Sequence, residues 1–180
     1  MSKKVFLIIT TLVLAATFSI VGMSCGPSEP SQFVTYIDEA GEFSIDHPDG
    51  WHVETHKESS DVKVSIWEKE FGLNPVGIMI AKYAASGHSL ESFSEFQIGA
   101  LPDITEDYVP ISTEELTING IPAIKHIHTS TINPTTYKSV RVYLVSNGTG
   151  WILGFNSPQK SFDSYKSTFD TSLNSFSVLD

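Results

Sequence analysis

Two histidines separated by one residue, His126 and His128, have the spacing best suited to metal chemistry in this chain. They fall in the run 121–132, whose alternating pattern predicts a strand, so both imidazoles project from one face together with Ile124. Neutral imidazoles are good ligands for zinc, copper and manganese ions. A third ligand would have to be a nearby acid or one of the other histidines, His47, His52, His56 and His88. The interpretation we favour is a pair of histidines on a solvated sheet face.

The single arginine of the chain, Arg141, alternates with two tyrosines, Tyr137 and Tyr143, along a second predicted strand. All three project from one face of that strand, because successive strand residues point to opposite sides. An arginine flanked by aromatic rings suits recognition of an anion or of a protein partner. The interpretation we favour is an ordinary surface ion pair, with recognition of an anion or partner as the alternative.

Acidic residues gather at Asp103, Glu106 and Asp107, and again at Glu114 and Glu115. Carboxylate oxygens suit calcium, but the spacing differs from the calcium-binding loop of EF-hand proteins. We therefore expect an exposed acidic loop.

The sequence lacks the short motifs of common enzyme classes. It contains no G-x-S-x-G elbow, no H-E-x-x-H helix, no phosphate-binding loop and no dinucleotide fingerprint. We expect a protein that is not an enzyme and that needs no cofactor, with a divalent metal at His126 and His128 as the alternative.

The only cysteine, Cys25, stands where an apolar run ends. Lys3 and Lys4 precede the apolar segment 5–21, and the small residue Ser24 comes directly before the cysteine, so residues 1–24 read as a signal peptide. A run that stops at a cysteine resembles a bacterial lipoprotein signal. This resemblance implies cleavage between Ser24 and Cys25 and lipidation of Cys25.

Two other interpretations of this segment stay open: a plain secretory signal with a free thiol, and an uncleaved N-terminal anchor. All three put the protein outside the cytoplasm. Acyl chains such as palmitate on Cys25 would hold it on the extracytoplasmic face of the cell membrane, since each buried methylene contributes about 0.8 kcal/mol. Residues 25–32 are rich in Gly, Pro and Ser and predict a flexible tether, followed by one domain over residues 33–180.

The net charge restricts the partners. Residues 1–24 hold two lysines and no acid, so their removal lowers the net charge from −10 to about −12. Such a surface repels phosphate backbones, which argues against nucleic acid. We expect membrane attachment through the lipid and another protein as partner.

Short alternating runs predict strands over most of residues 33–84 and 121–155. The Asn-Gly pairs at 119–120 and 147–148 predict tight hairpins. Helices are expected over 89–101, with Ser89 as N-cap, and from Ser157 onward, with Pro158 in the first turn. The pattern predicts an α+β domain, a central antiparallel sheet covered by helices.

The second predicted helix has one apolar stripe, which we expect to pack on the sheet rather than to bind a ligand. Its members are Phe162, Tyr165, Phe169, Leu173 and Phe176.

The stretch GEFSIDHPDGW (41–51) resembles the opening of the PsbP-like family. Three further stretches agree in order with that family: HSLESFSEFQIGAL (88–101), INGIPAIKHIH (118–128) and FDTSLNSFSV (169–178). The resemblance covers about residues 32–180.

The resemblance implies a central antiparallel sheet sandwiched by helices. Family members include extrinsic subunits of photosystem II that help retain calcium and chloride, assembly factors, and bacterial lipoproteins. It therefore implies a non-catalytic binding or assembly module anchored outside the cell membrane. The alternative is a lipoprotein that binds a metal or another small ligand through His126 and His128.

Overall fold

The computed structural model describes residues 30, 32–57, 60–69, 75–132 and 134–179. The predicted signal peptide, its cleavage site between Ser24 and Cys25, the lipidation site and most of the tether lie outside these residues. In the described part of the chain, no helix has both the length and the apolar character needed to cross a bilayer.

The chain forms ten strands and three helices in these described residues. The strands are β1 (Phe33–Ile37), β2 (Phe43–Pro48), β3 (His52–Thr55), β4 (Val62–Trp67), β5 (Gly77–Ala84), β6 (Glu106–Ile118), β7 (Ile121–Ile132), β8 (Thr135–Ser146), β9 (Thr149–Pro158) and β10 (Ser177–Val178). The helices are α1 (Leu90–Gly99), α2 (Leu101–Ile104) and α3 (Phe162–Ser175).

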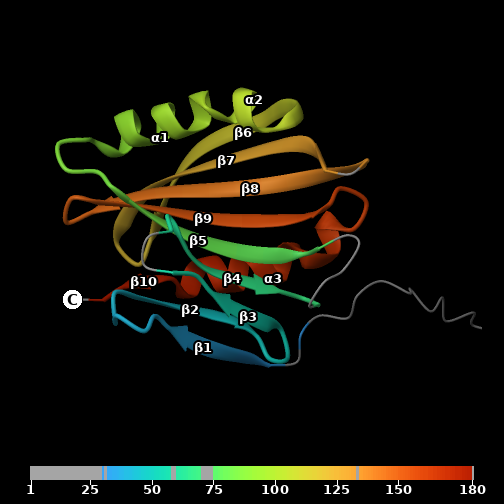
Figure 1. Cartoon of the computed structure of the whole chain (residues 1–180), viewed down its shortest axis with the longest axis horizontal. Coiled ribbons are helices and arrows are strands. Elements are labelled where there is room, and N and C mark those ends of the chain that lie inside the picture. Colours follow the sequence, from blue (N-terminus) through green and yellow to red (C-terminus); the bar gives the residue numbers. More distant parts are fainter. Residues whose placement is uncertain (1–29, 31, 58–59, 70–74, 133, 180) are drawn as a thin grey trace, which may run out of the picture.

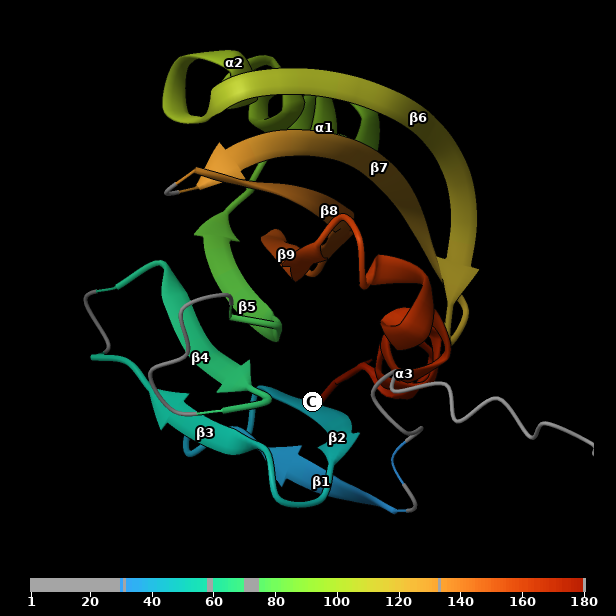
Figure 2. The same cartoon turned by 90° about the vertical axis from the view of Figure 1, so that its right-hand side faces the viewer.

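The strands build two antiparallel sheets (Figure 1). The larger sheet has seven strands in the order β3-β4-β5-β9-β8-β7-β6, and the smaller has three in the order β1-β2-β10. The predicted antiparallel sheet is confirmed. It is strongly curved, and Figure 2 shows β6 and β7 arching over the rest of the molecule.

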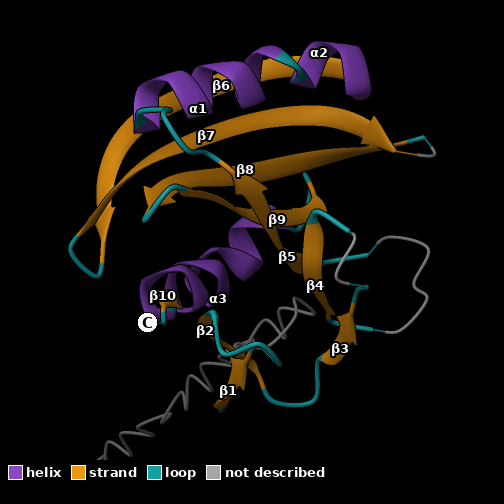
Figure 3. Ribbon diagram, turned by 60° about the vertical axis from the view of Figure 1, so that its left-hand side comes forward, coloured by secondary structure: helices purple, strands orange, loops and turns teal. Residues whose placement is uncertain are grey.

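The helices pack on opposite sides of the large sheet (Figure 3). Helices α1 and α2 lie over the side of β6, β7 and β8, and α3 lies on the concave side near β2 and β9. With only ten, four and fourteen residues, the helices cover less of the seven-stranded sheet than the expected sandwich implies.

The apolar stripe of α3 belongs to the main hydrophobic core. Phe169 is 4% exposed and its ring packs 5.2 Å from that of Phe155 on β9. Phe43 of the small sheet lies 5.4 Å from Trp151 of the large sheet and 6.0 Å from Phe176, which joins both sheets and the end of α3 in one core. The prediction that the stripe is core is confirmed.

Both Asn-Gly hairpins form as predicted. Asn119 and Gly120 have φ of 47° and 84°, and Asn147 and Gly148 have φ of 49° and 74°. These left-handed pairs match the twist of the flanking strands, β6 with β7 and β8 with β9.

The predicted start of the second helix is wrong. Strand β9 continues to Pro158, and the helix begins at Phe162 after a turn in which Ser161 N–H bonds to the Pro158 carbonyl. Ser89, in contrast, caps α1 as expected by accepting a hydrogen bond from the Ser92 N–H at 3.2 Å.

The predicted acidic loop is also wrong. Asp103 lies in α2, while Glu106, Asp107, Glu114 and Glu115 belong to the edge strand β6. All five side chains are exposed, as expected, but β6 pairs with β7 along most of its length, and Glu114 forms an ion pair with Lys125 of β7.

Candidate functional site

His126 and His128 point to the same face of β7, as predicted, but that face is buried. Their side chains are 2% and 1% exposed, so the expectation of a solvated face is wrong. The cover comes from Tyr108 of β6, whose ring lies 5.2 Å from His128 and 6.2 Å from His126.

A bulge in β6 places Tyr108 over the two histidines. The pairing with β7 shifts register between Glu106 and Val109, and Asp107 adopts a φ of 50°. Bulges of this kind turn a side chain away from its regular direction. The Thr131 hydroxyl donates a hydrogen bond to Asp107 Oδ2 at 2.9 Å, which stabilises the bulge.

Both ring nitrogens of His126 already have partners. Nε2 lies 2.8 Å from the Tyr108 hydroxyl, and Nδ1 lies 2.8 Å from the Thr113 hydroxyl. A neutral imidazole has one donor and one acceptor, and each hydroxyl can serve as either, so both hydrogen bonds form without a proton being added. Tyr108 and Thr113 were not predicted as site residues, because both belong to a strand that was not predicted.

The two histidines are held neutral by their surroundings. Burial, reinforced by the nearby Arg141 charge, lowers the pKa of His126. Burial, then Arg141, then His126 lower the pKa of His128 to about 4. Neutral imidazole is the form that binds metal, but no three His, Cys, Asp or Glu side chains of the described residues form a group that could hold a metal ion.

Strand β8 lies beside the histidines and carries the three residues predicted to bind a partner. Tyr137 and Tyr143 are 1% and 0% exposed, so their rings are not on the surface. Arg141 lies in register with His126 and is only partly buried. The expectation of a surface ion pair is wrong, because no carboxylate among the described residues pairs with Arg141.

A second polar region, which the sequence did not reveal, is a cleft of about 300 Å³ between the two sheets. Five of its residues come from the end of β1 and the turn to β2: Tyr36, Asp38, Glu39, Ala40 and Glu42. The other side is formed by Thr55 at the end of β3, His56 directly after it, Lys63 of β4 and Lys82 of β5.

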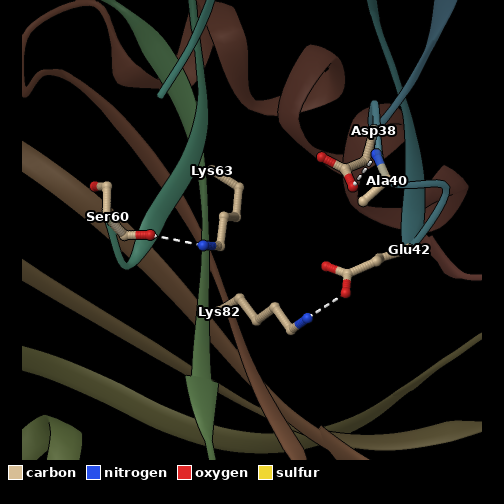
Figure 4. A network of polar contacts seen from close by, with 6 residues as sticks. All are labelled: Asp38, Ala40, Glu42, Ser60, Lys63 and Lys82. Atoms are coloured by element: carbon tan, nitrogen blue, oxygen red, sulfur yellow. Dashed lines mark hydrogen bonds and ion pairs between the residues drawn. The ribbon is translucent and has the colours of Figure 1, made fainter. Parts of the chain in front are cut away.

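The two sides of this cleft are joined by an ion pair between Glu42 and Lys82 (Figure 4). The Glu42 side is a fixed turn, in which Asp38 Oδ2 accepts a hydrogen bond from the Ala40 N–H at 3.1 Å and the Asp38 carbonyl accepts one from the Gly41 N–H at 2.8 Å. Opposite, Lys63 Nζ donates to the Ser60 carbonyl at 2.7 Å.

Charged groups of both signs therefore line the cleft. The carboxylates are Asp38, Glu39 and Glu42, and the ammonium groups belong to Lys63 and Lys82. Burial, followed by the charges of Asp38 and Glu39, raises the pKa of Tyr36 at the cleft wall, so its hydroxyl stays protonated and can donate. Such a surface suits a polar protein segment with its own charged groups.

Comparison with solved structures identifies the fold. Cyanobacterial PsbP (CyanoP) from Synechocystis sp. PCC 6803 superposes with a TM-score of 0.60 at 17% identity, covering 86% of this chain and 97% of that one. LpqN of Mycobacterium tuberculosis, described as involved in cell envelope biogenesis, gives 0.60 at 12% identity, covering 83% and 91%. PA94 of Pseudomonas aeruginosa, described as a putative regulator of unknown function, gives 0.53 at 9% identity, covering 79% and 94%.

Neither the family profiles nor the curated sequences compared with the chain give a match. The likeness to cyanobacterial PsbP covers 86% of this chain and agrees with the resemblance that we inferred from residues 32–180. The chain therefore has the PsbP fold.

Proposed function

We propose that the protein is a lipid-anchored, non-catalytic binding or assembly module on the extracytoplasmic face of the cell membrane, and that it binds a partner protein through the cleft between its two sheets. The cleft is the observation that carries this proposal. It brings together charged side chains that are up to 44 positions apart in the sequence, from Asp38 to Lys82, and it is open to solvent.

The chemistry of the cleft favours recognition over reaction. Its histidine, His56, forms a hydrogen bond of 2.9 Å to the Ser65 hydroxyl, a pairing that resembles a nucleophile with its base. Ser65, however, is 5% exposed, so its hydroxyl is not presented to a substrate. In this arrangement Ser65 holds the His56 ring in position at the cleft wall.

The location rests on the N-terminal sequence. The apolar segment that ends at Cys25 supports export and lipidation, and residues 25–32 would let the domain stand away from the membrane. LpqN, which shares the fold, is described as a protein of cell envelope biogenesis, and this supports placing the present protein in the envelope as well.

A second candidate function is binding of a divalent metal or another small ligand through His126 and His128. The observation in its favour is that two neutral imidazoles share one buried face, with ring centroids 5.5 Å apart. Binding would require His126 to give up its hydrogen bond to Tyr108 or Thr113 and would require a further ligand.

The test compares two charge reversals in the full-length protein, crosslinked in native membranes and then purified. Glu39→Lys changes the exposed wall of the cleft, and Glu95→Lys makes the same change on the exposed face of α1. We expect one discrete partner to be recovered with the wild type and with Glu95→Lys and to be lost with Glu39→Lys. Equal recovery with both variants would contradict the assignment of the cleft.

A further inference from the structure

Arg141 belongs to a row of polar side chains on the face of the large sheet that α1 covers. Alternate residues of β8 put Arg141 and Tyr143 on this face, and the register of β7 puts His126 beside Arg141 and His128 beside Ser139. Tyr143 packs edge-on against Phe93 of α1, with ring centroids 6.3 Å apart, which fixes the orientation of its ring.

Three polar atoms on this face are buried and have no hydrogen-bond partner among the described residues: the Tyr143 hydroxyl, His128 Nδ1 and the Tyr137 hydroxyl. Tyr143 lies two residues from Arg141 along β8, and Tyr137 lies four. Buried polar groups are paired in the great majority of cases, so an unpaired tyrosine hydroxyl in a side chain that is 0% exposed is a pointer to a ligand.

The Arg141 guanidinium is the charged group at this place. It is partly buried, and among the residues that the structure describes it makes neither an ion pair nor a hydrogen bond. Burial raises the pKa of Tyr143 and lowers the pKa of both histidines, and the Arg141 charge favours the deprotonated form of all three groups. Arg141 lies two residues from Tyr143 on the same face of β8, and it is in register with His126, which is two residues from His128 on β7. Burial and then the Asp61 charge raise the pKa of Tyr83, whose ring also packs against Phe93, and the Arg141 charge opposes this rise.

We propose that Arg141 and Tyr143 form a binding site for an oxyanion, a carboxylate or phosphate group of a small ligand. This site is separate from the cleft between the sheets, so either assignment can hold without the other. The anion would accept hydrogen bonds from the guanidinium and from the Tyr143 hydroxyl.

The donor set fits an oxyanion better than a cation or an apolar group. A guanidinium presents five N–H donors in a planar fork that matches two oxygens of a carboxylate or phosphate. Hydrogen bonds to a charged acceptor are roughly twice as strong as neutral ones, and partial burial strengthens them further. The neighbouring histidines are uncharged near pH 7, so the positive charge at this place comes from Arg141 rather than from an imidazolium.

The test uses inorganic phosphate and acetate as probes, followed by NMR of the Arg141 side-chain Nε–H in the mature protein. Sodium chloride at equal ionic strength serves as the baseline. We expect a saturable shift with a Kd of about 1 mM or tighter for at least one probe. Arg141→Gln should abolish it, and Tyr143→Phe, which keeps the ring packing against Phe93, should weaken binding about tenfold.

Lys138→Gln provides the matched control, because Lys138 lies three residues away on the opposite face of β8, over the Phe162 ring. Binding should be unchanged in this variant. Binding to vesicles that contain phosphatidylglycerol, but not to vesicles of phosphatidylcholine, would indicate an anionic lipid headgroup as the ligand. Binding of phosphate or acetate without binding to either vesicle would indicate a free anion. Either result supports the site if it depends on Arg141.

A shift that is linear in probe concentration, or that persists in Arg141→Gln, would overturn the proposal. If Arg141→Gln does not fold, Tyr143→Phe decides, and an unchanged affinity in that variant would overturn the proposal equally. Loss of anion binding with retained partner capture at the cleft would leave the proposed function intact.

Discussion

The hydroxyl of Tyr108 lies 2.8 Å from Nε2 of His126, and this contact holds the Tyr108 ring of the edge strand β6 over the histidine face of β7. The Tyr108 ring also lies against His128, at 5.2 Å between centroids. One tyrosine in a bulge thus shields two imidazoles from water. The consequence is a pair of histidines that resist protonation.

The first prediction is that stability falls as the pH drops from about 6.5 toward 4. The pKa of His128 is about 4 in the folded protein, and about 6.5 is usual in an unfolded chain. Between these values the unfolded chain takes up a proton that the folded chain does not, so the stabilisation is fully present above pH 6.5 and is lost on acidification. The loss amounts to at most about 3 kcal/mol. Urea unfolding at a series of pH values measures it.

His128→Gln should flatten this pH dependence, because glutamine does not titrate. His88→Gln is the matched control, since His88 is exposed in the loop before α1. The same acid-induced loss in wild type and His128→Gln would show that His128 is not its source.

The second prediction concerns the core position of α3. Phe169→Ala should lower the free energy of unfolding by about 3–5 kcal/mol, because it removes a 4% exposed ring that packs against Phe155. Phe96→Ala makes the same change on α1 at a side chain that is 73% exposed and should change stability by less than about 0.5 kcal/mol. Denaturant unfolding compares the two. A small effect of Phe169→Ala, with loss of a ligand instead, would make the stripe a binding surface.

Much of the fold of the domain could be predicted from local patterns in the sequence. Strand β7 begins and ends at the predicted residues, since it is an alternating run bounded by turn residues. The Asn-Gly pairs predicted both long hairpins, because few other residues adopt a positive φ at low cost. The apolar residues of α3 recur at helical spacing, and this pattern indicates a helix rather than a strand.

The features that could not be predicted from the sequence depend on contacts between distant parts of the chain. Strand β6 is acidic and exposed along most of its length, so it lacks the apolar alternation of a strand and is stabilised by pairing with β7. The cover over His126 comes from that missed strand, so its burial could not be predicted from β7 alone. The cleft was missed for a related reason, because Glu42 and Lys82 meet only when the two sheets pack together.

The third prediction is that zinc binds weakly at the two histidines. His126 uses both ring nitrogens in hydrogen bonds, and the described residues supply no group of three ligands, so we expect millimolar affinity at best. Calorimetric titration of the mature protein with zinc measures it. A stoichiometric, micromolar isotherm that disappears in both His126→Ala and His128→Ala would establish the metal-binding alternative.

The fourth prediction is lipidation at Cys25. Cys25→Ala should move the protein from the membrane fraction to the soluble fraction, because the variant lacks the thiol to which acyl chains attach. Ser28→Ala, three residues away in the tether, should leave the distribution unchanged. Mass spectrometry that finds an intact Met1 or an unmodified Cys25 would contradict this prediction.

The most direct test of the central claim is site-specific photocrosslinking of the full-length protein in native membranes. A photoreactive residue at Ala40, in the turn that forms one wall of the cleft, is compared with one at Ser92, on the exposed side of α1. We predict one discrete protein adduct from position 40 and none of the same mass from position 92. No adduct at position 40, or the same adducts from both positions, would contradict the account of the cleft as the partner-binding surface.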